Sequence, residues 1–136
     1  MAINYLAVLV AAIASMLVGM AWYSKSLFGK TWMALTKMTD QDMQKAKSKG
    51  MSKLYIAAFI AALVMSYVLA MFVDLFGAAT FSQALQVGFW IWLGFIATVM
   101  LNSVLWGGQP VKLYMINIGN LLVSLLVMSV ILTLWV

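Results

Sequence analysis

The residue types most often used in enzyme catalysis are scarce in this chain. Its 136 residues include no cysteine and no histidine, its eight basic residues are all lysine, and its three acids are Asp40, Asp42 and Asp74. Thiol nucleophiles, thiolate or imidazole metal ligands and the usual near-neutral general base are therefore missing. The three aspartates and the lysines form no convincing acid–base pair. We expect no catalytic residue, no metal site and no cofactor, so a membrane enzyme is not expected.

Hydroxyl and amide side chains inside long apolar stretches form a second set of candidates. They are Thr98, Asn102, Asn117, Asn120 and Ser124. Spacings of three and four place the last three on one helix face, and the first two lie at a similar depth in the preceding stretch. Two interpretations stay open: interhelical hydrogen bonds worth about 0.6 to 2 kcal/mol each, or a water or substrate site bounded by Asn102, Asn117 and Asn120. We expect the hydrogen bonds, because no central charge accompanies the asparagines.

Three further side chains are notable for their depth. Asp74 lies two residues before the end of the second apolar stretch, so we expect it at a helix end that is in contact with water. Proton-coupled transport normally uses an ionisable group within the membrane instead. Trp90 and Trp92 fall about two turns inside the third stretch. We expect these tryptophans to pack or to contact lipid rather than to hold a pigment or a quinone.

The elements that must position these residues are four apolar stretches. They cover residues 3–23, 54–76, 84–106 and 113–135, and each is long enough for a helix to cross a hydrocarbon core of about 30 Å. The chain is 66% hydrophobic and 8% charged, against roughly a quarter charged in a soluble domain. The first stretch lacks the basic segment of a secretory signal, so we interpret it as a retained span.

These stretches decide the fold class. Open strands are excluded, because lipid cannot satisfy their backbone groups, and the stretches lack the alternation of a membrane barrel. The sequence therefore predicts an all-α fold, a four-helix transmembrane bundle in which residues 1–136 form a single domain.

The lysines predict the orientation of the bundle. Seven of the eight lie in the connection 24–53, and Lys112 lies between the third and fourth stretches. By the positive-inside rule this side is cytosolic, which leaves both termini outside the cytosol. Because the lysines lie between apolar spans and not on a soluble face, the expected partner is the membrane surface and not nucleic acid.

The connection 24–53 is expected to have structure of its own. Thr39 can cap a short surface helix whose first turn holds Asp40 and Asp42 and whose end is marked by Gly50. Residues 27–33 mix aromatic, apolar and cationic side chains, as an interfacial segment does; a solvated linker with one buried tryptophan is the alternative. Six lysines are expected to contact anionic lipid headgroups: Lys25, Lys30, Lys45, Lys47, Lys49 and Lys53.

Small residues recur at a spacing of four on the first two stretches. The first series is Ala7, Ala11, Ser15 and Gly19, and the second is Ala58, Ala62, Ser66 and Ala70. Such series let helix backbones approach closely in lipid, although alanine is also simply common in membrane helices. We expect the two series to be packing surfaces.

Aromatic residues gather near the ends of the stretches. The expected interfacial anchors are Trp22, Tyr23, Trp32, Tyr55, Trp106, Tyr114 and Trp135. This distribution is typical of the aromatic belt of a membrane protein and not of a ligand pocket.

Several segments together resemble a bacterial membrane family. They are INYLA at 3–7, WYS at 22–24 followed by LFGK at 27–30, and KLYMIN at 112–117. The family is that of domain of unknown function 1761, and the likeness covers nearly the whole chain. It implies a four-span protein of the bacterial inner membrane and carries no activity. Where the family often has an acid and a base, this chain has GGQ at 107–109, which argues against a charged site in that turn.

Two functions are compatible with these features. The first is a non-enzymatic bundle that self-associates as a homo-oligomer or serves as an accessory subunit of a larger membrane complex. The alternative is an oligomeric channel or small-solute transporter, formed by several copies.

Overall fold

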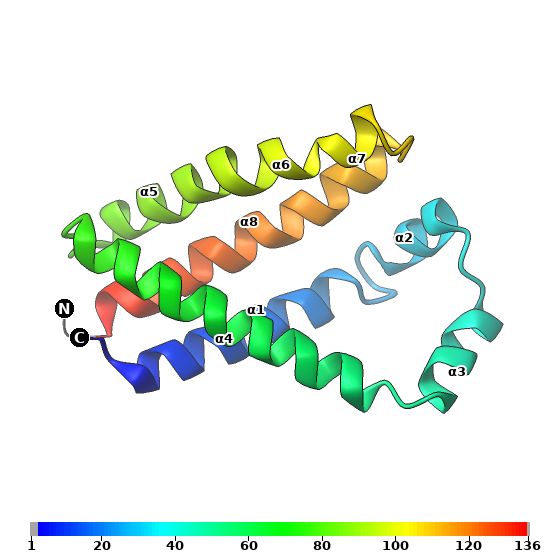
Figure 1. Cartoon of the computed structure of the whole chain (residues 1–136), viewed down its shortest axis with the longest axis horizontal. Coiled ribbons are helices and arrows are strands. Elements are labelled where there is room, and N and C mark those ends of the chain that lie inside the picture. The colour runs from blue at the N-terminus through cyan, green and yellow to red at the C-terminus, as the bar shows by residue number, and fades with distance from the viewer. Residues whose placement is uncertain (1–2, 136) are drawn as a thin grey trace.

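Helices joined by short connections make up the protein in the computed structural model, which describes residues 3–135 (Figure 1). Residues 1–2 and 136 of the predicted domain lie outside the described part. Four helical segments are long and apolar enough to cross a membrane: Tyr5–Trp22, Ser52–Leu75, Phe81–Leu105 and Val111–Leu134. The described residues contain no strand. The all-helical fold with four candidate spans is thus confirmed, and each observed boundary lies within about three residues of its predicted position.

The fourth span, α8 (Val111–Leu134), lies between the first span, α1 (Tyr5–Trp22), and the third, and it also contacts the second span, α4 (Ser52–Leu75). A buried cluster joins all four spans in the half of the bundle where α1 begins and α8 ends. It consists of Ala11, Leu69, Val73, Val87, Leu125 and Met128. This half therefore holds the tightest apolar packing.

The third span is not one continuous α-helix. It consists of α5 (Phe81–Trp92), a π-helical segment η1 (Leu93–Ala97), α6 (Thr98–Met100) and α7 (Asn102–Leu105). A π turn holds one more residue than an α turn, so each residue beyond it is rotated by about 100° relative to an uninterrupted helix. The side chains that follow η1 consequently face in directions that the α-helical period does not predict.

The second span leaves the bundle at its beginning. Residues 52–58 of α4 are all exposed, and they include the apolar Leu54 and Ile56. Figure 1 shows α4 crossing α1 and α8 at an angle, so that its first turns lie apart from the third span. The end of the third span is exposed as well, at Val99, Leu105 and Trp106.

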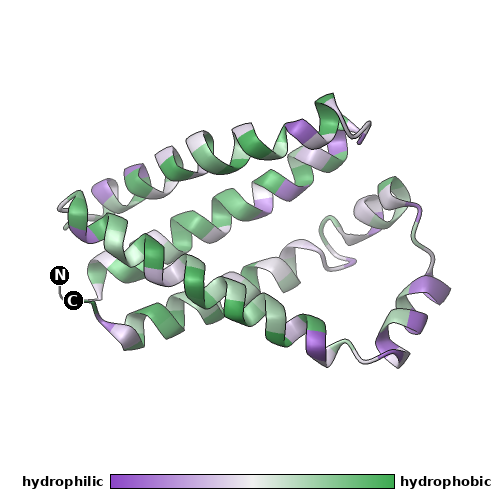
Figure 2. Cartoon of the chain, viewed as in Figure 1, coloured by the Kyte–Doolittle hydropathy of each residue, from purple (hydrophilic) through white to green (hydrophobic). Residues whose placement is uncertain are grey.

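Most charge lies at one end of the molecule. The helices α2 (Gly29–Thr36) and α3 (Asp40–Ser48) and the turn before α8 occupy the end opposite the start of α1 and the end of α8 (Figures 1 and 2). We call this the lysine-rich end, because the seven lysines of the first connection and Lys112 all lie there. Part of the segment 27–33, which the sequence predicts to be interfacial, belongs to the helix α2. This helix ends at Lys37, whose φ of 60° is left-handed.

The helix α3 begins where the sequence predicts. The Thr39 side chain accepts a hydrogen bond from the Asp42 backbone N–H at 3.1 Å, and the Thr39 N–H donates to the Asp42 carboxylate at 3.0 Å. This reciprocal capping box satisfies two amide groups that a helix start leaves unpaired. It also holds the pKa of Asp42 below its ordinary value, chiefly through the Thr39 backbone N–H.

Candidate functional site

The two predicted small-residue series are only partly engaged with each other. Ala7 and Ala11 on α1 and Ala62 and Ser66 on α4 are buried. The Ser66 hydroxyl donates to the Val8 carbonyl at 2.8 Å. A serine side chain reaches a neighbouring helix backbone only when the two helices approach closely, as small residues allow.

The remaining members of these series lie in other surroundings. Ser15, Gly19 and Ala70 are half-buried, and Ala58 is exposed on the diverging part of α4. A Cβ placed on Gly19 would lie 3.9 Å from the Asn120 side-chain oxygen. The small-residue face of α1 therefore packs against α4 in the first half of the helix and faces α8 in the second half.

Another close helix contact joins α5 to α8 at Gly88, a residue that the sequence reasoning missed. A Cβ on Gly88 would lie 2.8 Å from the Ser129 hydroxyl oxygen and 3.0 Å from the Leu125 carbonyl oxygen. Ala84, four residues earlier on the same face, is fully buried. Ala84 and Gly88 form a pair of small residues at spacing four, which is the sequence signal for this contact, but the pair is shorter than the four-member series on the first two spans.

The intramembrane polar residues do not form the expected contact between the third and fourth spans. Thr98 and Asn102 are exposed, and they donate to the carbonyls of Gly94 and Val99 on their own span, at 2.7 and 3.0 Å. The rotation introduced by η1 turns these side chains away from the predicted face, and short polar side chains readily bond to preceding carbonyls of the same helix.

Instead, the asparagine face of α8 is turned toward α1. The Tyr23 hydroxyl donates to the Asn117 side-chain oxygen at 2.7 Å. Ser124, on the same face, is buried. The interhelical hydrogen bond is thus present, but it joins the first and fourth spans.

Two tryptophans connect their spans to the backbone of α8. The indole N–H of Trp22 donates to the Ile116 carbonyl at 2.9 Å, and that of Trp92 donates to the Ile118 carbonyl at 2.7 Å. Both side chains are half-buried. Trp22 also lies directly against Gly119, where a Cβ would come within 2.8 Å of the indole ring. These tryptophans thus act as packing and hydrogen-bonding residues within the bundle.

Tyr114 completes the contact between α8 and the third span. Its hydroxyl donates to the carbonyl of Ala97, the last residue of η1. Since Trp92 immediately precedes η1, the π segment is fixed to α8 on both sides. The Tyr114 hydroxyl thereby gives a carbonyl at the end of the π turn a hydrogen-bond partner from another helix.

The other expected anchors lie at the ends of the spans. Trp106 is 85% exposed, and Tyr55 and Trp135 are also exposed. Trp90, two residues before the inward-facing Trp92 and therefore on roughly the opposite face of α5, is exposed as well. The aromatic residues therefore divide into an inward set and an outward set that the sequence positions alone did not separate.

Three buried oxygen atoms have no hydrogen-bond donor among the described residues. They belong to Asn120, Ser129 and Thr133, all on α8. Asn120 lies opposite Gly19, at the level of the bonded pair of Tyr23 and Asn117. An unpaired polar atom is costly in an apolar environment, so the contact between α1 and α8 leaves the Asn120 side-chain oxygen incompletely satisfied.

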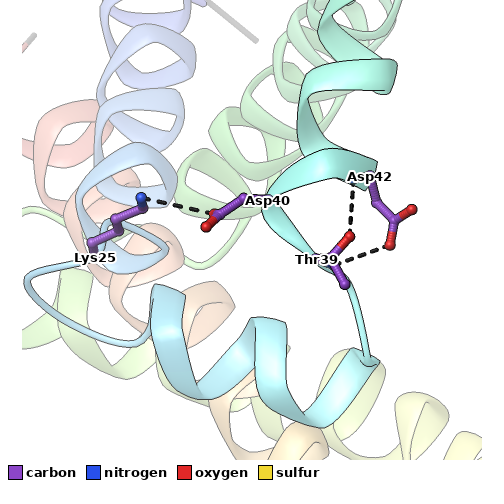
Figure 3. A network of polar contacts seen from close by, with 4 residues as sticks. All are labelled: Lys25, Thr39, Asp40 and Asp42. Atoms are coloured by element: carbon purple, nitrogen blue, oxygen red, sulfur yellow. Dashed lines mark hydrogen bonds and ion pairs between the residues drawn. The ribbon is translucent and has the colours of Figure 1, made fainter.

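A cavity of about 730 Å³ opens at the lysine-rich end, between the end of α1, α2 and α3. Tyr23 and Trp32 lie on its inner side, with ring centroids 6.0 Å apart and planes at 69°. Lys25 and Asp40 lie on its outer side, and their charged groups are 3.9 Å apart (Figure 3). The cavity thus combines an aromatic wall with a charged rim.

Within residues 3–135, no group of three or more acidic, histidine or cysteine side chains comes close enough together to hold an ion. Asp74 is exposed at the end of α4, far along the helix from the lysine-rich end.

Four long apolar helices, packed through small residues and interhelical hydrogen bonds, define a multi-pass membrane protein. The chain belongs to the family described as "Protein of unknown function (DUF1761)", which matches residues 6–133. The resemblance noted from the sequence is thereby confirmed. No curated protein and no solved structure gives a match to the chain.

Proposed function

We propose that this protein is a non-enzymatic subunit of the bacterial inner membrane that assembles with further copies of itself. The lysine-rich end faces the cytosol in this proposal, and both termini face the opposite side. The support for the orientation is the charge distribution, since all eight lysines lie at one end of the bundle.

The observation that carries the self-association is the diverging first half of α4. Residues 52–58 and Ala61 are exposed, although α4 is as apolar as the other spans. The exposed surface includes Ala57 and Ala61, one helical turn apart. Small residues at this spacing suit close contact with another helix, and within the described chain the neighbouring spans do not cover them.

Disulfide crosslinking tests this interface directly, because the natural chain has no cysteine. Ala57→Cys would be placed on the exposed half of α4, and Leu17→Cys, 59% exposed on α1, is a matched control at a similar distance from the lysine-rich end. Oxidation in native membranes should yield a dimer for Ala57→Cys and little for Leu17→Cys.

The outcomes separate the assembly from random collision. Equal crosslinking of the two variants would contradict a specific interface at α4. A different chain that co-purifies in fixed ratio in native mass spectrometry, with no second copy of this protein, would favour the accessory-subunit form of the proposal.

A channel would require polar side chains to line a continuous path through the membrane. Thr98 and Asn102 are exposed on the third span, whereas Asn117 bonds to Tyr23 between α1 and α8. One copy therefore presents these polar groups on two separate surfaces, so a polar path would have to form where Thr98 and Asn102 of several copies meet. Liposome flux that disappears in Asn102→Leu, with the bundle still folded, would support that alternative.

A further inference from the structure

We propose that the cavity between the end of α1, α2 and α3 binds the phosphate headgroup of an anionic phospholipid. The inference concerns a defined site at the lysine-rich end and does not depend on self-association. It differs from a general attraction between lysines and the membrane, because it singles out the lysines that line the cavity.

The position and shape of the cavity suit an amphiphilic ligand. It lies where α1 ends, which is the depth at which a membrane helix meets the headgroups. The inner side carries Trp32, Met33 and Met43, all half-buried, and the outer side carries Lys25 and Lys47. An apolar wall beneath a cationic rim matches the boundary between the glycerol and acyl part of a lipid and its phosphate.

The charge at the rim is available to a ligand. The Lys25 ammonium lies 3.9 Å from the Asp40 carboxylate, and these side chains are 73% and 79% exposed. An ion pair so open to water is weak, so a phosphate can replace the Asp40 carboxylate as the partner of the Lys25 ammonium. Lys47 projects from α3 onto the same cavity and supplies the second cation. The Asp40 carboxylate, which faces the Lys25 ammonium in Figure 3, would compete with the phosphate for that group.

A pair of matched variants distinguishes the site from diffuse attraction. Lys25→Gln with Lys47→Gln removes the two cavity lysines, and Lys45→Gln with Lys49→Gln removes two exposed lysines of the same segment that do not line the cavity. Both variants lose the same charge. All four side chains are exposed, so the fold is expected to survive, and helical content and melting in nanodiscs check it.

The readout is lipid retention by native mass spectrometry after purification from nanodiscs containing equal amounts of phosphatidylglycerol and phosphatidylcholine. The cavity variant should retain about tenfold less phosphatidylglycerol, and the control variant should lose less than about threefold. Equal losses in the two variants, or no loss in the cavity variant, would overturn the proposal. Binding of inorganic phosphate to the cavity in a protein that retains no phosphatidylglycerol would show a site for soluble phosphate and would overturn the lipid assignment.

A third variant separates ligand binding from a structural role for Lys25. Asp40→Asn removes the carboxylate that competes for the Lys25 ammonium, so it should raise the retention of phosphatidylglycerol. If Lys25 served only to hold α3 through Asp40, this substitution would lower retention along with the Lys25 variant, and that result would refute the headgroup site.

Discussion

Gly88→Ala is the substitution whose effect follows most directly from the packing of α5 on α8. The new Cβ would lie 2.8 Å from the Ser129 hydroxyl oxygen and 3.0 Å from the Leu125 carbonyl oxygen. The carbonyl belongs to the backbone of α8, so relief requires the two helices to separate. Overpacking of this kind costs typically about 1 to 3 kcal/mol, and the better helix propensity of alanine offsets up to about 1 kcal/mol of it. The expected net loss in the free energy of unfolding is about 0 to 2 kcal/mol relative to the natural protein, and about 1 to 3 kcal/mol relative to a glycine-to-alanine change that meets no neighbouring atom.

Gly94→Ala provides the matched control on the same span. A Cβ on Gly94 meets no atom within 4 Å, so this alanine should leave stability unchanged or raise it slightly. Thermal unfolding of both variants in the same nanodiscs gives the comparison, and adding Ser129→Ala to Gly88→Ala should restore part of the loss by removing the nearer oxygen. Equal melting of the Gly88 and Gly94 variants would refute the close contact between α5 and α8.

The other predictions concern individual hydrogen bonds. Ser66→Ala should lower stability by about 0.6 to 1.7 kcal/mol through loss of the bond to α1, measured by unfolding in nanodiscs; an unchanged value would remove the energetic role of that bond. Tyr23→Phe and Asn117→Leu should show a coupling of about 0.6 to 2 kcal/mol in a double-mutant cycle, and strict additivity would contradict their pairing. The folded state lowers the pKa of Asp42. The ionised carboxylate therefore stabilises α3 fully at pH values above the pKa of an unfolded aspartate, near 4, and this stabilisation is lost as the pH falls through the lower pKa of the folded state. Hydrogen exchange at the Thr39 amide should therefore accelerate in that acidic range beyond the normal pH trend, and Asp42→Asn should abolish this step.

The sequence was sufficient for the features that depend on length and local chemistry. The spans follow from apolar stretches long enough to cross lipid. The start of α3 follows from Thr39 and Asp42, whose side chains complete a cap with groups three residues away. The Ser66 contact follows from a small-residue face, although the partner atom on Val8 could not be specified.

The features that were missed depend on how one helix is rotated against another. Trp90 and Trp92 are only two residues apart, yet Trp92 donates to α8 and Trp90 is exposed. Likewise, Trp22 and Trp106 both lie at span ends, yet Trp22 donates to α8 and Trp106 is exposed. Position along a span gives depth, but only the packed structure gives the direction of a side chain. The segment η1 adds to this difficulty, because a π turn has no clear mark in composition and rotates everything after it.

Cysteine labelling of the two sides of the membrane tests the central claim of a four-span bundle with its lysine-rich end in the cytosol. Ser48→Cys would report on the end of α3, and Ala79→Cys on the connection between α4 and α5 at the opposite end. A membrane-impermeant maleimide added to intact cells with a permeable outer membrane should label Ala79→Cys and leave Ser48→Cys unlabelled until the inner membrane is opened. Labelling of both from the same side would contradict the topology, and the reverse pattern would contradict the orientation.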